Sequence, residues 1–128
     1  MKKFITFGIL LMTFLTSSVC SAFGYNCRVP LKGTTIADKK LQKKTIMTVY
    51  LAVGTAMPTS CKKMSIIDTK VTKEPYDVEY QDDKKIAGKW EEIWTVNACG
   101  QEYDAPIEFI IGKTGVSYII YPKNVISK

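Results

Sequence analysis

The stretch GKWEEIWTVNACG, residues 88–100, holds both tryptophans of the chain. Trp90 and Trp94 recur with a period of two, which is typical of a β-strand with one buried face. Gly100 closes the stretch as a turn signal, because glycine tolerates the backbone conformations of tight turns. The stretch therefore predicts a central strand that ends in a hairpin and carries Glu92 on its inward face, between the tryptophans.

Two hairpins follow from the turns around the next strand. A two-residue loop at Gly100 and Gln101, with glycine first as in a type II′ turn, sets the first register. The expected pairs are Cys99–Glu102, Val96–Ala105, Trp94–Ile107, Glu92–Phe109 and Trp90–Ile111. A turn at Gly112–Gly115 adds the pairs Ile111–Val116, Phe109–Tyr118 and Ile107–Ile120. Both turns place the large apolar residues on one face of the sheet.

A helix near the N-terminus supplies the other large apolar surface. Thr35 followed by Asp38 is a capping-box signal and predicts a helix that begins near Ile36 and ends near Gly54. Its first half is charged on nearly every side and its second half is apolar all round. We therefore expect the second half to be buried and the first half to project into solvent.

The remaining elements complete the predicted fold. Residues 65–72 alternate as a strand, and residues 74–85 are polar and contain Pro75, which favours a long loop or a ragged edge hairpin. A sheet with one apolar face must be covered, and the helix is available to cover it. The sequence thus predicts an α+β fold: one N-terminal helix packed on an antiparallel sheet of about four strands in meander order.

The first 22 residues are typical of a cleaved secretory signal peptide. Lys2 and Lys3 precede the apolar run FITFGILLMTFL, which small and polar residues follow. This run is shorter than the about 20 residues that cross a bilayer. We expect export, cleavage of residues 1–22, and a single domain over residues 23–128 that is not transmembrane. Loss of two lysines lowers the formal net charge from +6 to +4.

Three cysteines stay in the mature chain: Cys27, Cys61 and Cys99. An oxidising compartment favours one disulfide among them. If the strand at 65–72 pairs antiparallel with the tryptophan strand, Cys61 and Cys99 come close, and their bridge stabilises the fold by about 4 kcal/mol. Cys27 is then either a free thiol or a link to another chain.

We expect an irregular register between the strand at 65–72 and the tryptophan strand, beside this bridge. A straight ladder from Cys61 and Cys99 would place Asp68 against Glu92, whereas alternation favours Ile67 and Val71 on the tryptophan face. We therefore expect a β-bulge, or a Cys61 that lies outside the strand.

Composition argues against several classes of function. The chain has no histidine, no Cys-x-x-Cys motif and no carboxylate spacing of a calcium loop, so we expect no metal ligands, no cofactor and no catalytic residue. The net charge is too small and too scattered to predict nucleic-acid binding.

Two charged segments are candidate binding surfaces, although each is also typical of a solvated exterior. One is the basic start of the predicted helix, with Lys39, Lys40, Lys43 and Lys44. The other is the tip of the polar segment, with Asp82, Asp83, Lys84 and Lys85.

Glu92 is the unusual residue of the predicted core. A carboxylate on an apolar face must be paired or have a perturbed pKa. One interpretation is a tuned general acid or a ligand-binding carboxylate in an aromatic cleft. The other is a structural glutamate that an indole N–H, Tyr50, Tyr118 or a helix lysine satisfies. We favour the structural interpretation, because catalysis needs a second carboxylate or a base on the same face and none is expected there.

The pattern W-x-E-x-W-x-V-x-x-C-G, followed by EYDAPIEFIIGKTG, resembles a group of small exported proteins of Gram-negative bacteria, most of them without an assigned activity. The residues that carry it are Trp90, Glu92, Trp94, Val96, Cys99, Gly100 and Gly115. The resemblance implies a periplasmic or surface-associated module with a Cys61–Cys99 bridge and no known chemistry. Similar small proteins occur as accessory subunits of Dot/Icm-type secretion systems at the outer membrane. Cys27 lies outside the pattern.

Three functions are compatible with these features. The leading hypothesis is a non-enzymatic, exported interaction module of the cell envelope that binds protein partners, with peripheral membrane association or oligomerisation as further options. The alternative is a secreted inhibitor of an enzyme such as a lysozyme or a protease, acting through a protruding loop at residues 74–88. The second alternative is a small hydrolase centred on Glu92.

Overall fold

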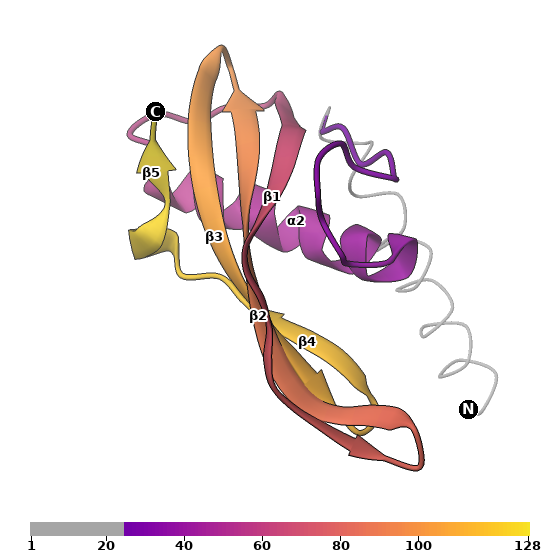
Figure 1. Cartoon of the computed structure of the whole chain (residues 1–128). Helices are drawn as coiled ribbons and strands as arrows, with labels where there is room; N and C mark the ends of the chain where they lie inside the picture. Colours follow the sequence, from indigo (N-terminus) through magenta and orange to yellow (C-terminus); the bar gives the residue numbers. More distant parts are fainter. Residues whose placement is uncertain (1–24) are drawn as a thin grey trace, which may run out of the picture.

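The computed structural model describes residues 25–128, so the predicted signal peptide lies outside the described residues. One helix packs on one antiparallel sheet, which confirms the predicted α+β fold (Figure 1). The elements are α2 (Lys39–Ala56), β1 (Met64–Gln81), β2 (Lys84–Ala98), β3 (Gln101–Gly112), β4 (Gly115–Ile119), the short 3-10 helix η1 (Pro122–Asn124) and β5 (Ile126–Ser127).

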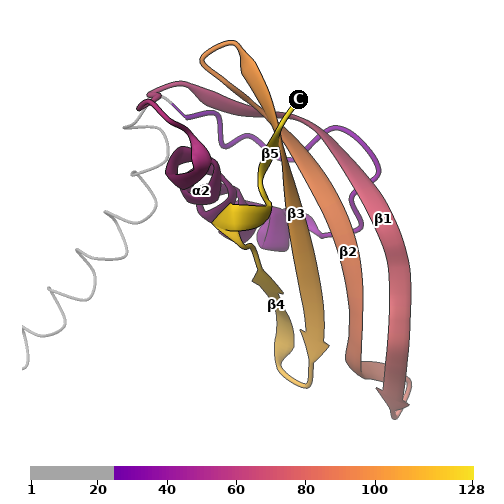
Figure 2. The ribbon, with the colours of Figure 1, turned by 90° about the vertical axis from the view of Figure 1, so that its left-hand side faces the viewer.

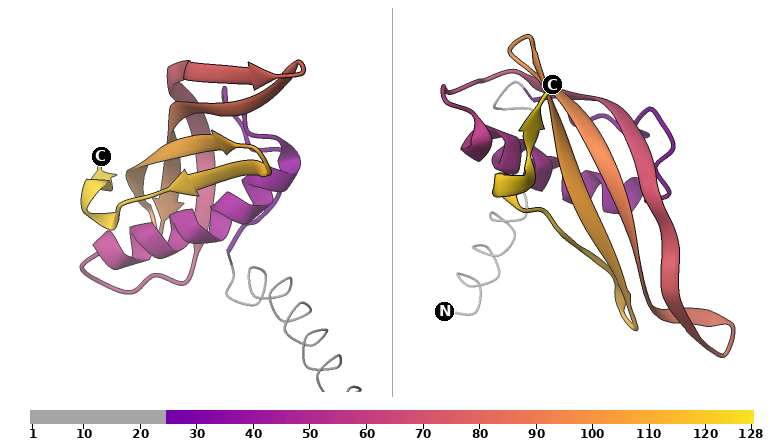
Figure 3. Two further views of the ribbon diagram at one scale, coloured as in Figure 1. Left: turned by 90° about the horizontal axis from the view of Figure 1, so that it is seen from below. Right: turned by 60° about the vertical axis from the view of Figure 1, so that its left-hand side comes forward.

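The sheet follows the predicted meander, in the order β1-β2-β3-β4. β5 also pairs with β3, beside Tyr103 and Asp104, whereas β4 pairs with the opposite end of β3. The sheet curves, and α2 lies on its concave side (Figure 2). The helix covers only part of that side, because the β1–β2 hairpin extends beyond it (Figure 3).

The helix begins later than predicted, at Lys39 rather than near Ile36. Asp38 is the N-cap, and its carboxylate accepts a hydrogen bond of 2.8 Å from the backbone N–H of Leu41. Thr35 instead accepts from the N–H of Ala37 in a local turn. Asp38 therefore caps the helix itself and is not the third residue of a capping box.

The buried face of α2 is a stripe that runs along most of the helix, so the prediction of a buried second half was too simple. The stripe comprises Leu41, Gln42, Thr45, Ile46, Val49, Tyr50, Ala52 and Val53. Leu51, in the second half, is 64% exposed. The helix lies flat along the sheet, and both halves keep one face in solvent.

The first hairpin has a register shifted by two residues from the predicted one. Its loop is Cys99–Gly100, so Ala98 pairs with Gln101 and Trp94 pairs with Ala105. Both loop residues have a positive φ, 52° and 87°, as a type I′ turn requires. The backbone N–H of Cys99 is held by the carbonyl of Lys63, and this contact helps to fix the less common conformation. Because side chains alternate with a period of two, the shift leaves the predicted inward face unchanged.

The second hairpin has the predicted register as far as β4 extends, and the predicted pair Ile107–Ile120 lies beyond its last pair, Glu108–Ile119. Ile111 pairs with Val116, and Phe109 pairs with Tyr118. The turn at residues 113–114 is followed by a positive-φ glycine, Gly115, the first residue of β4, which explains why this turn could be located from the sequence.

The β1–β2 pairing contains the predicted bulge, between Ile66 and Asp68. Cys61 also lies outside the strand, before Met64. The prediction that Ile67 faces the tryptophans was wrong: Ile66 is buried, whereas Ile67 sits in the bulge and is 38% exposed. The polar segment at 74–85 forms a ragged edge hairpin whose two-residue turn is Asp82–Asp83.

Candidate functional site

Glu92 is completely buried and accepts three hydrogen bonds. Its Oε1 accepts from the indole N–H of Trp94 at 2.8 Å, and its Oε2 accepts from the indole N–H of Trp90 at 2.7 Å. The backbone N–H of Ile36 also donates to Oε2, at 3.2 Å. The two tryptophans reach Glu92 because residues two apart on a strand share a face. The indole partners were among those expected, whereas Ile36 was not.

This arrangement explains why a core strand keeps a carboxylate between two tryptophans. A buried indole N–H needs an acceptor, and Glu92 supplies one to each ring. Trp90 also stacks on Phe109 with ring centroids 4.7 Å apart, and Trp94 tilts against the same ring at 6.2 Å. Glu92 thus positions the aromatic core and fastens the chain before α2 to the sheet.

The segment before α2 runs along the edge of β1, a contact that the sequence did not predict. The hydroxyl of Thr69 donates to the carbonyl of Lys32, and the carbonyl of Thr69 accepts from the N–H of Thr34. Gly33 lies between these contacts with a φ of 106°, and a Cβ there would come within 2.1 Å of the Thr69 carbonyl oxygen. Only glycine permits this approach. The segment covers the first half of the β1 edge.

Tyr50 joins the helix to both neighbouring segments. Its hydroxyl donates to the carbonyl of Asn26 and accepts from the N–H of Ile66. Burial, partly offset by the hydrogen bond from Ile66, raises the pKa of Tyr50 from 10.0 to about 12. The neutral phenol is therefore the form that the fold requires.

The predicted disulfide between Cys61 and Cys99 is present, with Cα atoms 6.0 Å apart. The prediction of a free thiol at Cys27 was wrong, because Cys27 is disulfide-bonded and none of the described cysteines is free.

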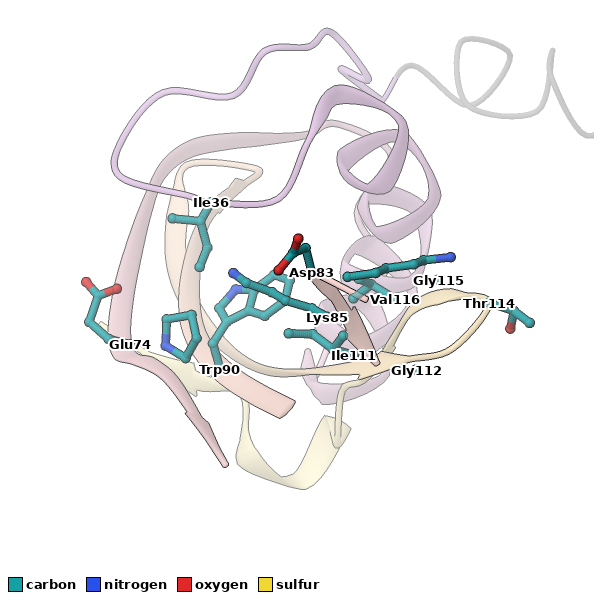
Figure 4. A pocket seen from close by; sticks show the side chains of 12 residues that line it. Ile36, Glu74, Asp83, Lys85, Trp90, Ile111, Gly112, Thr114, Gly115 and Val116 are labelled. Carbon is teal, nitrogen blue, oxygen red and sulfur yellow. The ribbon is translucent and has the colours of Figure 1, made fainter. Parts of the chain in front are cut away.

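An open cleft of about 820 Å³ lies where the helix no longer covers the sheet. Its walls are the end of the β1–β2 hairpin and the turn between β3 and β4, and its apolar lining includes Trp90, Ile111 and Val116 (Figure 4). Ile36, which is 47% exposed, lies on its rim. Trp90 thus connects the cleft directly to the buried carboxylate of Glu92.

The two predicted charged surfaces lie on either side of the β3–β4 turn. Asp83, Lys84 and Lys85 line the cleft. Lys40 and Lys44 line a neighbouring depression of about 240 Å³, which shares Thr114, Gly115 and Val116 with the cleft. Lys39, Lys43 and Asp82 are exposed but line neither hollow. Sequence periodicity could not reveal this arrangement, because it depends on how the sheet curves past the end of the helix.

Within residues 25–128 no group of three or more histidine, cysteine, aspartate or glutamate side chains is placed to hold a metal ion. No helix of that part of the chain is long and apolar enough to cross a membrane. Comparisons of the chain with protein-family models, with curated proteins and with solved structures find no match.

Proposed function

We propose that this protein is a non-enzymatic, exported interaction module of the bacterial cell envelope, and that it binds a protein partner through the projecting end of its β1–β2 hairpin. We call residues 77–87 the arm. The disulfide and the apolar segment after Lys2 and Lys3 support export to an oxidising compartment. The finer hypothesis, an accessory subunit of an outer-membrane secretion assembly, rests on the sequence resemblance alone.

The shape of the arm is the observation that carries this proposal. The first residue of β2 that pairs with β3 is Gly88, so residues 84–87 pair only with β1. A two-stranded ribbon is marginally stable by itself and adds little to its own core. Tyr80 on this ribbon is 62% exposed. A projecting ribbon with an exposed tyrosine is suited to contact a partner, since tyrosine is enriched in interfaces.

The proposal is tested by photo-crosslinking in the native envelope. A photoreactive residue replaces Tyr80, and a matched control replaces Leu51, which is 64% exposed on the outer face of α2. We expect a discrete protein adduct, identified by mass spectrometry, from position 80 and none from position 51. Adducts from Leu51 alone, or from neither position, contradict binding through the arm.

Enzyme inhibition is a second candidate function, and the turn at the tip of the arm favours it. Asp82 and Asp83 have φ values of 52° and 64°, so the tip is a tight type I′ turn that presents a defined shape. Replacing Asp82–Asp83 by Asn–Gly preserves this turn type and removes both charges. If the protein inhibits an envelope hydrolase through the tip, this variant loses inhibition while its circular dichroism spectrum is unchanged. Full inhibition by the variant excludes a role for the carboxylates.

The hydrolase alternative gains no support from Glu92. A general acid must reach the atom that it protonates. Glu92 is 0% exposed, and both of its oxygens already accept hydrogen bonds from the protein. Its geometry favours the structural interpretation.

A further inference from the structure

The cleft beside the arm has a lining that suits a hydrocarbon chain. Ile36, Pro75, Trp90, Ile111 and Val116 contribute its apolar surface. Its volume of about 820 Å³ lies within the range of about 300 to 1,000 Å³ that is typical of small-molecule sites. The indole of Trp90 is fixed by its stacking on Phe109 and by its bond to Glu92, so this wall is pre-formed.

The backbone of the β3–β4 wall offers the cleft few hydrogen-bond partners, and the polar groups of the lining are the side chains of Glu74, Asp83, Lys84, Lys85 and Thr114. Ile111 pairs with Val116 and Gly112 pairs with Gly115, so the ladder uses backbone groups of this wall within the protein. A bound peptide would have to bury its own N–H and C=O groups against apolar side chains, which is unfavourable. An acyl chain has no such groups to satisfy.

The charges that line the cleft are balanced, but positive charge is in excess around the adjoining β3–β4 turn. Lys84 and Lys85 line the cleft, and Lys113 lies in the turn whose other residues form one wall. Lys40 and Lys44 lie beyond the same turn. Among the described residues, none of these five lysines forms an ion pair. Glu74 and Asp83 also line the cleft and balance Lys84 and Lys85, and Asp38 lines the neighbouring depression. The five lysines therefore face three carboxylates, and the surplus comes from Lys113, Lys40 and Lys44 around the β3–β4 turn.

We propose that this cleft binds a single-chain anionic amphiphile, with its acyl chain against Trp90, Ile111 and Val116 and its anionic head at Lys84 and Lys85. The apolar wall contributes most of the affinity by removing hydrocarbon from water. The lysines select an anionic head group over a neutral or cationic one. This site shares Lys84 and Lys85 with the arm, but the binding of an amphiphile does not rest on the protein partner proposed there.

Tryptophan fluorescence of the full chain reports on binding, because Trp90, which is 5% exposed, lines the cleft, whereas the only other tryptophan, Trp94, is 0% exposed and does not line it. Laurate is titrated below its micelle concentration, in parallel with dodecyl maltoside and dodecyltrimethylammonium. We expect saturable binding of laurate that weakens as ionic strength rises, and weaker binding of the neutral and cationic probes. Lauroyl-lysophosphatidylglycerol is then titrated to compare a phosphate head group with the carboxylate of laurate. Tighter binding of one probe shows whether the site prefers a lysophospholipid or a fatty acid.

A pair of variants on β4 tests whether the cleft is the site. Val116 lines the cleft, whereas its neighbour Ser117 is exposed on the other face of the strand. Val116→Glu places a charge in the apolar wall and should weaken laurate binding by about tenfold or more. Ser117→Glu adds the same charge to the same strand and should leave the affinity unchanged.

A second pair tests the head-group contact. The double change Lys84→Glu and Lys85→Glu should weaken laurate binding by about three- to tenfold and should remove most of its salt dependence. The control is Lys39→Glu with Lys43→Glu, which makes the same charge change away from the cleft.

Three results overturn the proposal. They are no saturable laurate binding to the wild-type protein, equal loss in Val116→Glu and Ser117→Glu, and equal affinity for the anionic and cationic probes. An apolar side chain of a protein is the competing occupant of the cleft, and it predicts the first of these results. Thermal unfolding of each variant shows that a lost signal reflects binding and not loss of the fold.

Discussion

The two ends of the sheet differ in what covers them, although β1 and β2 run through both. At the covered end, α2 and residues 25–36 close over Trp94, Val96 and Phe109, all of which are fully buried. At the open end, the arm extends past the helix (Figure 2), and Trp90 becomes part of a cleft wall (Figure 4). One pair of strands thus supplies both a core and a binding surface.

The pairing of β1 with β2 is regular at the covered end and irregular toward the open end. From Met64 to Val71 it has a single bulge, whereas between Val71 and Tyr80 it has four irregularities. Asp77 has a positive φ of 54°, and Gly88 on β2 has a φ of 144°. Bulges increase the local twist and re-aim a strand. The irregular stretch therefore turns the arm away from the helix. Because the regular part of the ladder lies at the covered end, we expect most of the stability of the fold to come from that end.

The largest expected effect is loss of the disulfide at the covered end. Replacing Cys61 and Cys99 together by serine should lower the free energy of unfolding by about 4 kcal/mol, because the bridge closes a loop with a sequence separation of 38. Equilibrium unfolding in urea measures the change. A loss smaller than about 1 kcal/mol would show that the covered end does not depend on this bridge.

The next effect is removal of one acceptor from the buried carboxylate. In Glu92→Gln one carboxylate oxygen becomes an NH₂ group, which cannot accept the hydrogen bond that an indole N–H donates to that oxygen. The free energy of unfolding of the variant should therefore fall by about 2 to 3 kcal/mol. Glu91→Gln is the matched control, since Glu91 is only partly buried and its ion pair with Lys73 is 4.0 Å long. Urea unfolding of both variants gives the comparison, and equal stability of the two would contradict a structural role for Glu92.

Gly88 lies where the two ends meet, and a side chain there should cost about 2 kcal/mol. A Cβ at Gly88 would come within 3.1 Å of Val78 and 3.3 Å of Ile111, in addition to the strain of its positive φ. Gly115 has nearly the same φ, 143°, and nothing within 4 Å of the added Cβ. The difference in melting temperature between Gly88→Ala and Gly115→Ala therefore measures the cost of the close contact with Val78 and Ile111, because the backbone strain is nearly the same in both variants. No difference would mean that the strands separate easily at the boundary.

Tyr50 makes the covered end sensitive to alkaline pH. Its pKa is about 12 in the folded protein against 10.0 for an unperturbed tyrosine, so the unfolded chain releases this proton first as pH rises. The contribution of Tyr50 is fully present below pH 10 and is lost as pH rises through 12, by about 2 kcal/mol at pH 12. Stability of the wild type and of Tyr50→Phe is measured across this range. A wild-type curve parallel to that of Tyr50→Phe would refute this linkage.

Much of the covered end could be predicted from the sequence because its signals are local. Alternation around Trp90 and Trp94 gave the inward face, and the proximity of Cys61 to Cys99 followed from antiparallel pairing. The exact loop at Cys99–Gly100 could not be predicted in the same way, because a glycine is compatible with more than one hairpin turn and a long-range contact to Lys63 helps to hold the observed one.

At the open end the two hairpins could be predicted from their turn residues, but the cleft between them could not, because it depends on the curvature of the sheet and on contacts distant in sequence. The charges of Lys44 and Lys84 are visible in the sequence, but their approach to a common turn is set by the twist of the sheet. At the covered end, the contact of Gly33 with Thr69 also has no periodic signature, although an isolated glycine beside threonines is a recognisable breaker.

The smallest expected effect is at the tip of the arm, and it completes the contrast with the disulfide. Replacing Asp82–Asp83 by Asn–Gly should change the free energy of unfolding by less than about 0.5 kcal/mol, since both residues are exposed and the turn type is kept. Urea unfolding at the same protein concentration gives the value. A loss comparable to that of Glu92→Gln would mean that the arm contributes to the stability of the core. If substitutions in the arm leave the free energy of unfolding unchanged, the sequence of the arm can adapt to a binding partner without destabilising the fold. Substitutions at the covered end cannot.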